Sequence, residues 1–181
     1  MKKIIALTIL LFCFVCSGCG FHMRSDSEFP DQLQTIYFSS TKPYGELSTQ
    51  LNNLFHAMNI RVVKKQSAAR FSILVSKNKF IYSRPDIVDT TLPTSINFVS
   101  FASVTILDNQ NKKAVISNSF TATQSLTLNV NQIYTTNSNT LIKQQLNRKI
   151  AYLIYYWLTS SNTKMALNHA TAPQSIKHSR Q

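Results

Sequence analysis

The chain has 181 residues and a formal net charge of +12, from 19 Lys and Arg against seven Asp and Glu. Its three cysteines are Cys13, Cys16 and Cys19. Disulfides and cysteine metal sites are therefore excluded for the rest of the chain, which must be stabilised by packing.

The N-terminus carries a processing signal. Lys2 and Lys3 precede the uncharged apolar run Ile4 to Val15, and small residues stand directly before Cys19. The apolar run is too short to cross a bilayer, which needs about 20 residues. We expect residues 1–18 to be a lipoprotein signal peptide and Cys19 to receive a diacylglyceryl and an N-acyl lipid.

Removal of the two N-terminal lysines leaves a charge of +10, because all seven acidic residues follow the signal. A basic exported protein favours an anionic partner, such as phospholipid, lipopolysaccharide or an acidic protein face, over nucleic acid. The alternative is that the charge only keeps the protein soluble. Composition divides the chain into an anchor and linker at 19–34, one domain at 35–158 and a disordered tail at 159–181.

The first half of the domain predicts a strand at 35–38 and then an amphipathic helix from Glu46, whose apolar residues recur at helical spacing. Residues 60–63 fit either a strand end or a loop. Residues 70–82 predict a long strand that is interrupted at 77–79.

The middle of the chain predicts a long antiparallel hairpin. Residues 96–107 and 114–128 alternate apolar with polar side chains, and residues 108–111 turn the chain between them. The outward residues are mostly Ser, Thr and Asn. This polar, uncharged face suits a wet interface, the inside of a β-barrel or bulk water, and the pattern alone does not separate the three.

A second helix is predicted at 139–158, because large apolar residues there recur at the spacing of a buried stripe. Its aromatic residues are expected to pack in the core and at its rim. The order of elements predicts an α+β fold in two layers, with about four mostly antiparallel strands and two helices packed on one face.

Enzyme chemistry has little support in this sequence. The four histidines, His22, His56, His169 and His178, form no metal-binding spacing such as HExxH. After the signal only Gly20 and Gly45 remain as glycines, too few for a nucleophile elbow or a phosphate loop. We expect no catalytic residue, no metal and no cofactor beyond the lipid on Cys19.

The residues after the signal carry a resemblance to a known family. Residues 19–24, Cys-Gly-Phe-His-Met-Arg, resemble the start of mature LptE, the LPS-assembly lipoprotein family. The segment Pro-Tyr-Gly-Glu-Leu-Ser at 43–48 and the terminal helix, with Leu-Ile-Lys at 141–143, resemble the same family. The similarity covers most of residues 19–158, and the middle is similar only in pattern.

The resemblance implies an outer-membrane lipoprotein on the periplasmic side that plugs the lumen of the LptD β-barrel, assists its assembly and binds lipopolysaccharide. Gly20, in place of Asp, fits release to the outer membrane. Contacts to lipid phosphates need accessible Lys or Arg near a loop. The candidates are Lys77, Lys79 and Arg84 first, and Lys112 and Lys113 second.

Two further points stay open at this stage. The alternative function is a generic envelope lipoprotein that binds anionic lipid or scaffolds an envelope complex. Residues 83–95, with two prolines, are a candidate loop for contact with the barrel wall.

Overall fold

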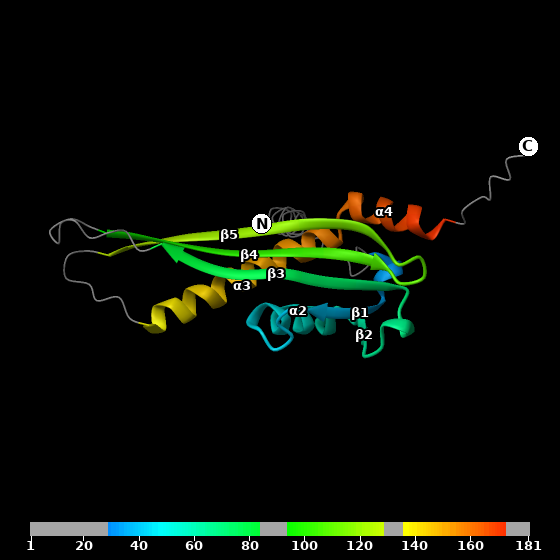
Figure 1. Cartoon of the computed structure of the whole chain (residues 1–181), viewed down its shortest axis with the longest axis horizontal. Helices are drawn as coiled ribbons and strands as arrows, with labels where there is room; N and C mark the ends of the chain where they lie inside the picture. The colour runs from blue at the N-terminus through cyan, green and yellow to red at the C-terminus, as the bar shows by residue number, and fades with distance from the viewer. Residues whose placement is uncertain (1–28, 84–93, 129–135, 173–181) are drawn as a thin grey trace, which may run out of the picture.

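Three stretches of the chain, residues 29–83, 94–128 and 136–172, are described by the computed structural model (Figure 1). The elements in chain order are η2 (Asp31–Leu33), β1 (Thr35–Ser40), α2 (Glu46–Ala57), β2 (Arg61–Val63), η3 (Gln66–Ala68), β3 (Phe71–Ser83), β4 (Thr94–Asp108), β5 (Lys113–Leu128), α3 (Thr136–Leu158) and α4 (Ser161–Thr171).

The strands form one sheet in the order β2-β1-β3-β4-β5. β1 is parallel to both of its neighbours, whereas β3, β4 and β5 form an antiparallel meander. The predicted α+β class with helices on one face is confirmed, and the strand count is five instead of about four. The extra strand is β2, in the segment 60–63. The helix α2 connects β1 to β2 as a crossover, so the two strands run parallel.

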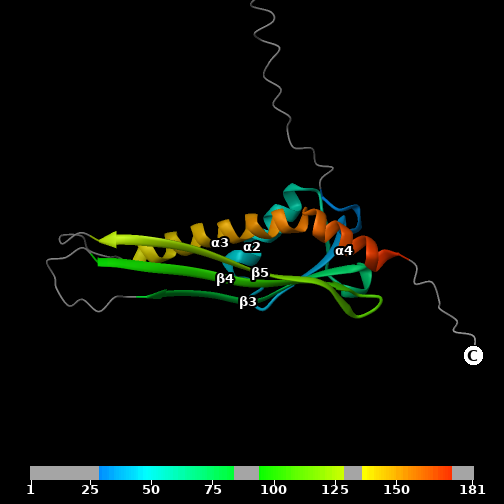
Figure 2. The ribbon, with the colours of Figure 1, turned by 90° about the horizontal axis from the view of Figure 1, so that it is seen from above.

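Figure 2 shows α2, α3 and α4 in one layer on the same side of the sheet. Between the layers lies one core, to which every second residue of β4 from Ile96 to Ile106 contributes a buried side chain. α3 faces it with buried residues at helical spacing. The Ser100 hydroxyl donates to Asn147 Oδ1 at 3.1 Å, so the buried polar pair between β4 and α3 is hydrogen-bonded. The largest buried side chains are Phe55, Phe71, Phe98, Leu33, Ile36, Leu47, Leu51, Ile73, Ile106, Leu146, Ile150 and Ile154.

β3 does not break at the predicted interruption; it contains a β-bulge there. The pairing with β4 shifts between Ser76 and Lys79, and Lys77 has a positive φ of 51°. The extra residue changes which side chains face the core. Odd residues such as Val75 are buried before the bulge, and Phe80 stacks on buried Phe98 after it, with ring centroids 6.2 Å apart.

Two domain boundaries differ from their predictions. The linker was expected to extend to residue 34, but Phe29 and Leu33 are buried in the core. The predicted disordered tail from residue 159 is wrong for 161–171, which form α4. Ser160 caps this helix by accepting a hydrogen bond from the Thr163 backbone N–H, and Leu167 is fully buried. Residues 173–181 of the predicted tail lie outside the described residues.

Candidate functional site

The outer face of the sheet, opposite the helices, carries a regular band of hydroxyl groups. Every second residue of β5 from 117 to 127 is Ser or Thr, and each of these side chains is exposed. In the register with β4 they lie opposite outward residues that are also mostly uncharged and polar. We define the hydroxyl face as the outward residues Ser117, Ser119, Thr121, Thr123, Ser125 and Thr127 of β5 with Ser95, Asn97, Ser103 and Thr105 of β4.

Four cross-strand pairs of the hydroxyl face are hydrogen-bonded through their side chains, whereas Thr121 and Thr123 lie opposite Phe101 and Val99. The hydroxyl oxygens of Ser103 and Ser119 lie 2.9 Å apart, and those of Thr105 and Ser117 lie 2.8 Å apart. Nearer the other end of the hairpin, the Ser125 hydroxyl donates to Asn97 Oδ1 at 2.6 Å. Because these groups already have partners, the face costs less to remove from water than a charged surface would.

An apolar island interrupts the hydroxyl face beside β3. Ile81 is 61% exposed and pairs with Val99, and the next outward pair along the strands is Lys79 with Phe101. Val99 and Phe101 are half-buried, and Lys79 is exposed. A cation thus stands at the edge of an apolar surface, which is the arrangement that an anionic amphiphile requires.

The first predicted cation cluster is therefore within a strand and not at a strand end. Lys77 lies within the β3 bulge and Lys79 is the first paired residue after it, and both are exposed. The strand continues beyond them to Ser83. Arg84, the third member, lies outside the described residues, as does most of the loop at 83–95 that was considered for the barrel wall.

Lys112 and Lys113, the second predicted pair, lie at the turn between β4 and β5. In the strand register Lys113 lies opposite Asp108 of β4, whereas Lys79 lies opposite Phe101, seven residues earlier on the same strand. At the rise of an extended strand this separates the two cation pairs by about 23 Å. They do not form one site.

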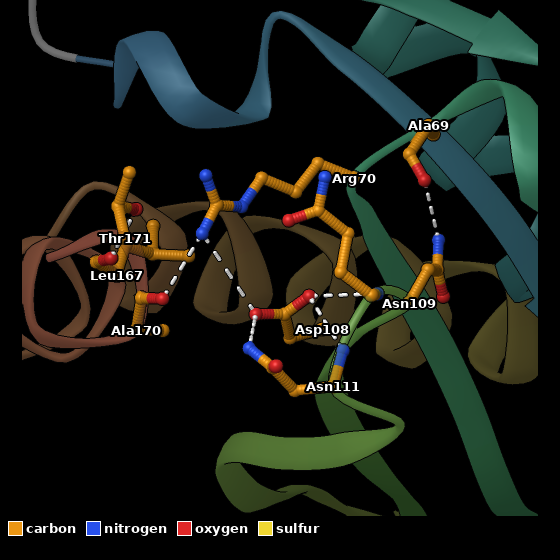
Figure 3. Close-up of polar contacts among 9 residues, drawn as sticks. Ala69, Arg70, Asp108, Asn109, Asn111, Leu167, Ala170 and Thr171 are labelled. Atoms are coloured by element: carbon orange, nitrogen blue, oxygen red, sulfur yellow. Dashed lines mark hydrogen bonds and ion pairs between the residues drawn. The ribbon is translucent and has the colours of Figure 1, made fainter. Parts of the chain in front are cut away.

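A polar junction at the same turn holds three distant segments together (Figure 3). Arg70 Nη2 donates to the Ala170 carbonyl at 3.0 Å and lies 4.0 Å from Asp108 Oδ2. Asp108 is 1% exposed and accepts hydrogen bonds from the Gln110 backbone N–H and the Asn111 side-chain amide. We call Arg70, Asp108 and Ala170 the Arg70 junction.

The Arg70 junction has a structural task. Its guanidinium neutralises a buried carboxylate and bonds a carbonyl in the last turn of α4, where a cation is favoured by the helix dipole. An open depression of about 710 Å³ beside it is lined by Arg70, Lys113 and His169, among others. Sequence reasoning missed this junction because its members are far apart in the chain and none belongs to a recognisable motif.

The described residues offer little for catalysis or metal binding. Within 29–83, 94–128 and 136–172, no group of three or more His, Cys, Asp or Glu is placed to hold a metal ion. In the same part of the chain, no helix has the length and apolar character needed to cross a membrane. The lipidation residue Cys19 precedes the described residues, so its modification stays a prediction.

Part of the chain is similar in sequence to known proteins that share one name. The chain is 31% identical over 61 residues to the LPS-assembly lipoprotein LptE of Pectobacterium atrosepticum, covering 34% of this chain and 33% of that protein. It is 30% identical over 66 residues to the protein of the same name from Photorhabdus laumondii, covering 36% of each. The matches thus span about a third of these relatives' length, and no family model matches. The resemblance seen in the sequence is confirmed as a similarity to proteins of this name.

Solved structures share the fold at low identity. The rare lipoprotein B from Shewanella oneidensis superposes with a TM-score of 0.60 at 14% identity, covering 75% of this chain and 99% of that one. An uncharacterized lipoprotein B from Nitrosomonas europaea gives a TM-score of 0.58 at 14% identity, covering 83% and 96%. At these identities the comparison shows the fold alone.

Proposed function

We propose that this chain is an LPS-assembly lipoprotein, anchored through Cys19 to the periplasmic side of the outer membrane, that plugs an LptD-like β-barrel and assists lipopolysaccharide transport to the cell surface. It acts by binding and has no catalytic step. The proposal is supported by relatives of this name that align with about a third of the chain, and by a fold that agrees with that of solved lipoproteins.

The observation that carries the barrel partner is the hydroxyl face. The lumen of an outer-membrane barrel is polar, and a protein that fills it must lose water from a broad surface. Burial of unpaired charges costs several kcal/mol each, about an order more than burial of a hydroxyl that keeps its hydrogen bond. β5 has no charged residue from Ala114 to Leu128, and the hydroxyls of Ser117, Ser119, Ser125 and Thr127 are paired across the hairpin.

Lipopolysaccharide binding is supported by the apolar island beside the β3 bulge. Lys77 and Lys79 offer ammonium donors for lipid phosphates. Ile81, Val99 and Phe101 offer adjacent apolar surface for an acyl chain. Lys112 and Lys113 are too far away to contact the same phosphate and remain a second, separate candidate.

Recovery of the partner from the envelope tests the barrel interaction. Tagged full-length protein is extracted in mild detergent, and we expect a large β-barrel protein in near-equal amount. Thr121→Lys with Thr123→Lys places two charges on the hydroxyl face and is expected to lower recovery at least about tenfold, because each lysine must be desolvated in the interface. The matched control is Gln144→Lys with Gln145→Lys, which adds the same charge to exposed positions of α3.

Two outcomes contradict the barrel proposal. Recovery of the lipoprotein alone, or only with soluble partners, would favour the alternative of a generic envelope lipoprotein. If both double-lysine variants recovered the barrel protein equally poorly, the added charge would act regardless of the face that carries it.

A further inference from the structure

The two edges of the sheet differ in length and in charge. β2 forms one edge with three residues, begins at the exposed Arg61 and is followed by the exposed Lys64 and Lys65. Short strands and cations are devices by which proteins keep a sheet edge from pairing with another chain. β5 forms the other edge with 16 residues (Figure 1). Its single charged residue is Lys113 at the first position, and it contains no proline, so neither device protects it.

The backbone groups of β5 that face this edge can be assigned from side-chain hydrogen bonds. In an antiparallel pair, residues that exchange backbone hydrogen bonds alternate with residues that do not, and side chains lie closer in the second kind. The hydroxyl oxygens of Ser103 and Ser119 lie 2.9 Å apart, and Ser125 donates to Asn97 at 2.6 Å. These pairs are therefore of the second kind, and the N–H and C=O groups of Ser119 and Ser125 point away from β4.

A backbone hydrogen bond supports the same assignment. The Ser119 N–H donates to Asn118 Oδ1 at 2.9 Å, which requires that this N–H point away from β4. The register between β4 and β5 is unbroken from Ile116 to Leu128, so the alternation continues along the strand. We define the β5 edge as the residues whose backbone groups face outward by this alternation, Ser117, Ser119, Thr121, Thr123, Ser125 and Thr127.

The β5 edge is long and open within the part of the chain that the structure describes. From Ser117 to Thr127 it extends for about 33 Å at the rise of an antiparallel strand. No backbone group of another described loop or helix is hydrogen-bonded to these residues. A long, uncharged edge with free donors and acceptors is a template to which an extended segment can add as a further strand.

The side chains around the β5 edge indicate what kind of segment would fit. On one side of the sheet the edge residues carry the hydroxyls of the hydroxyl face, so an added strand would extend that face. On the other side Ile116 and Leu126 are only half-buried, and further apolar side chains could cover them. A segment that alternates uncharged polar with apolar residues matches both sides.

The source of the segment follows from the closure of a barrel. Every wall strand of a closed barrel is already paired on both sides, so the wall itself has no free edge to offer. A loop folded into the lumen or a terminal extension of the barrel protein has unpaired backbone groups. A second copy of this chain fits less well, because two strongly basic proteins repel each other.

We propose that the β5 edge binds an extended loop or terminal segment of the barrel partner through a ladder of backbone hydrogen bonds. The inference rests on the proposed barrel function and adds the mode of binding. The hydroxyl face supplies a broad uncharged surface, and the adjoining edge supplies directional hydrogen bonds that fix the partner segment in one register.

The test removes backbone donors from the edge. Thr121→Pro with Thr123→Pro deletes two outward N–H groups, and an edge strand tolerates proline where its N–H faces outward. The matched control, Thr121→Val with Thr123→Val, removes the same hydroxyls and keeps both N–H groups. Each tagged full-length variant is extracted in mild detergent and the co-recovered barrel protein is measured. We expect the valine variant to recover it within about twofold of wild type and the proline variant to recover at least about tenfold less.

Hydrogen exchange of the wild-type protein gives a second measurement that needs no proline. Exchange is resolved to single residues by electron-transfer fragmentation, for the free protein and for the barrel complex. We expect the N–H groups of Thr121, Thr123 and Ser125 to exchange at least about tenfold more slowly in the complex. Those of Ala122 and Gln124, which are bonded to β4, should be protected in both states. If the proline variant loses its circular dichroism signal, this pattern decides the question.

The outcomes separate this inference from the barrel proposal. Equal recovery of the barrel by folded proline and valine variants, or unchanged exchange at Thr121, Thr123 and Ser125, would overturn the edge inference and leave the barrel proposal standing. Absence of the barrel from the wild-type preparation would overturn both. A wild-type dimer that the proline variant cannot form would also overturn the inference and would assign the β5 edge to a second copy of this chain.

Discussion

The hydroxyl face and the outer side of α3 are both exposed, yet their side chains differ in chemistry. The outer side of α3 carries the exposed residues Leu141, Arg148, Tyr152 and Tyr156. The hydroxyl face has hydroxyls and amides that bond one another, and its β5 strand is free of charge from Ala114 to Leu128. The outer side of α3 combines large apolar and aromatic side chains with the guanidinium of Arg148, and α3 has no acidic residue. The difference shows that charged side chains are absent from one exposed surface of this domain and present on the other.

The layer between the faces gives the largest expected effect. Phe98→Ala removes a fully buried ring that stacks on Phe80, and we expect it to lower the free energy of unfolding by about 3–5 kcal/mol. Its partner for comparison is Phe101→Ala on the outward side of the same strand, with an expected loss of about 1 kcal/mol. Urea unfolding followed by circular dichroism measures both. Equal losses of unfolding free energy would mean that the two sides of β4 do not differ in burial as described.

Truncation of the buried leucine of α4 should have the next largest effect on stability, confined to one end of the helical layer. Leu167→Ala is expected to cost about 2–5 kcal/mol locally, because the side chain is fully buried in the shared core. Hydrogen exchange should then accelerate in residues 161–171 while α3 and the hairpin keep their protection. Uniform acceleration across the chain would contradict an independent role for this helix.

The N-terminal cap of α4 should contribute less. Ser160→Ala removes the acceptor of the Thr163 backbone N–H, and we expect a loss of about 1 kcal/mol. The same hydrogen-exchange measurement gives the value from the protection of α4. Ser160→Asp preserves the cap and should restore wild-type protection, and its failure to do so would assign the effect to something other than capping.

The hydroxyl face itself should be nearly neutral for stability. Thr105→Val removes one partner of the Thr105–Ser117 hydrogen bond on an exposed surface, and the free energy of unfolding should change by no more than about 0.5 kcal/mol. A loss above 2 kcal/mol in urea unfolding would show that the hydroxyl pairs hold the sheet together and would weaken their assignment to partner binding.

The parts of the fold that could be predicted are those in which periodicity carries the signal. The hairpin of β4 and β5 follows from strict alternation over long strands, and α2 and α3 follow from their apolar stripes. α4 could not be predicted from composition, because one buried leucine, one serine cap and a distant arginine stabilise it.

One part of the candidate site could be predicted from the sequence. The uncharged outward face of the hairpin was visible in the alternation of apolar and polar residues. The geometry of the cations was not, because Lys77 and Lys79 read as an interruption of the strand, whereas a one-residue bulge keeps the strand continuous and shifts its inward set from odd to even residues. The aromatic residues of α3 were expected in the core and at its rim. Tyr155 and Trp157 pack against the core, and Tyr152 and Tyr156 are each 52% exposed.

The most direct test of the account is photocrosslinking in living cells from two positions. A photoreactive amino acid replaces Thr123 on the hydroxyl face or Gln145 on the outer side of α3 in the full-length protein. The account predicts a crosslink to a large outer-membrane β-barrel from position 123. A barrel crosslink from position 145 alone, or from neither position, would contradict the claim that the hydroxyl face is the partner surface.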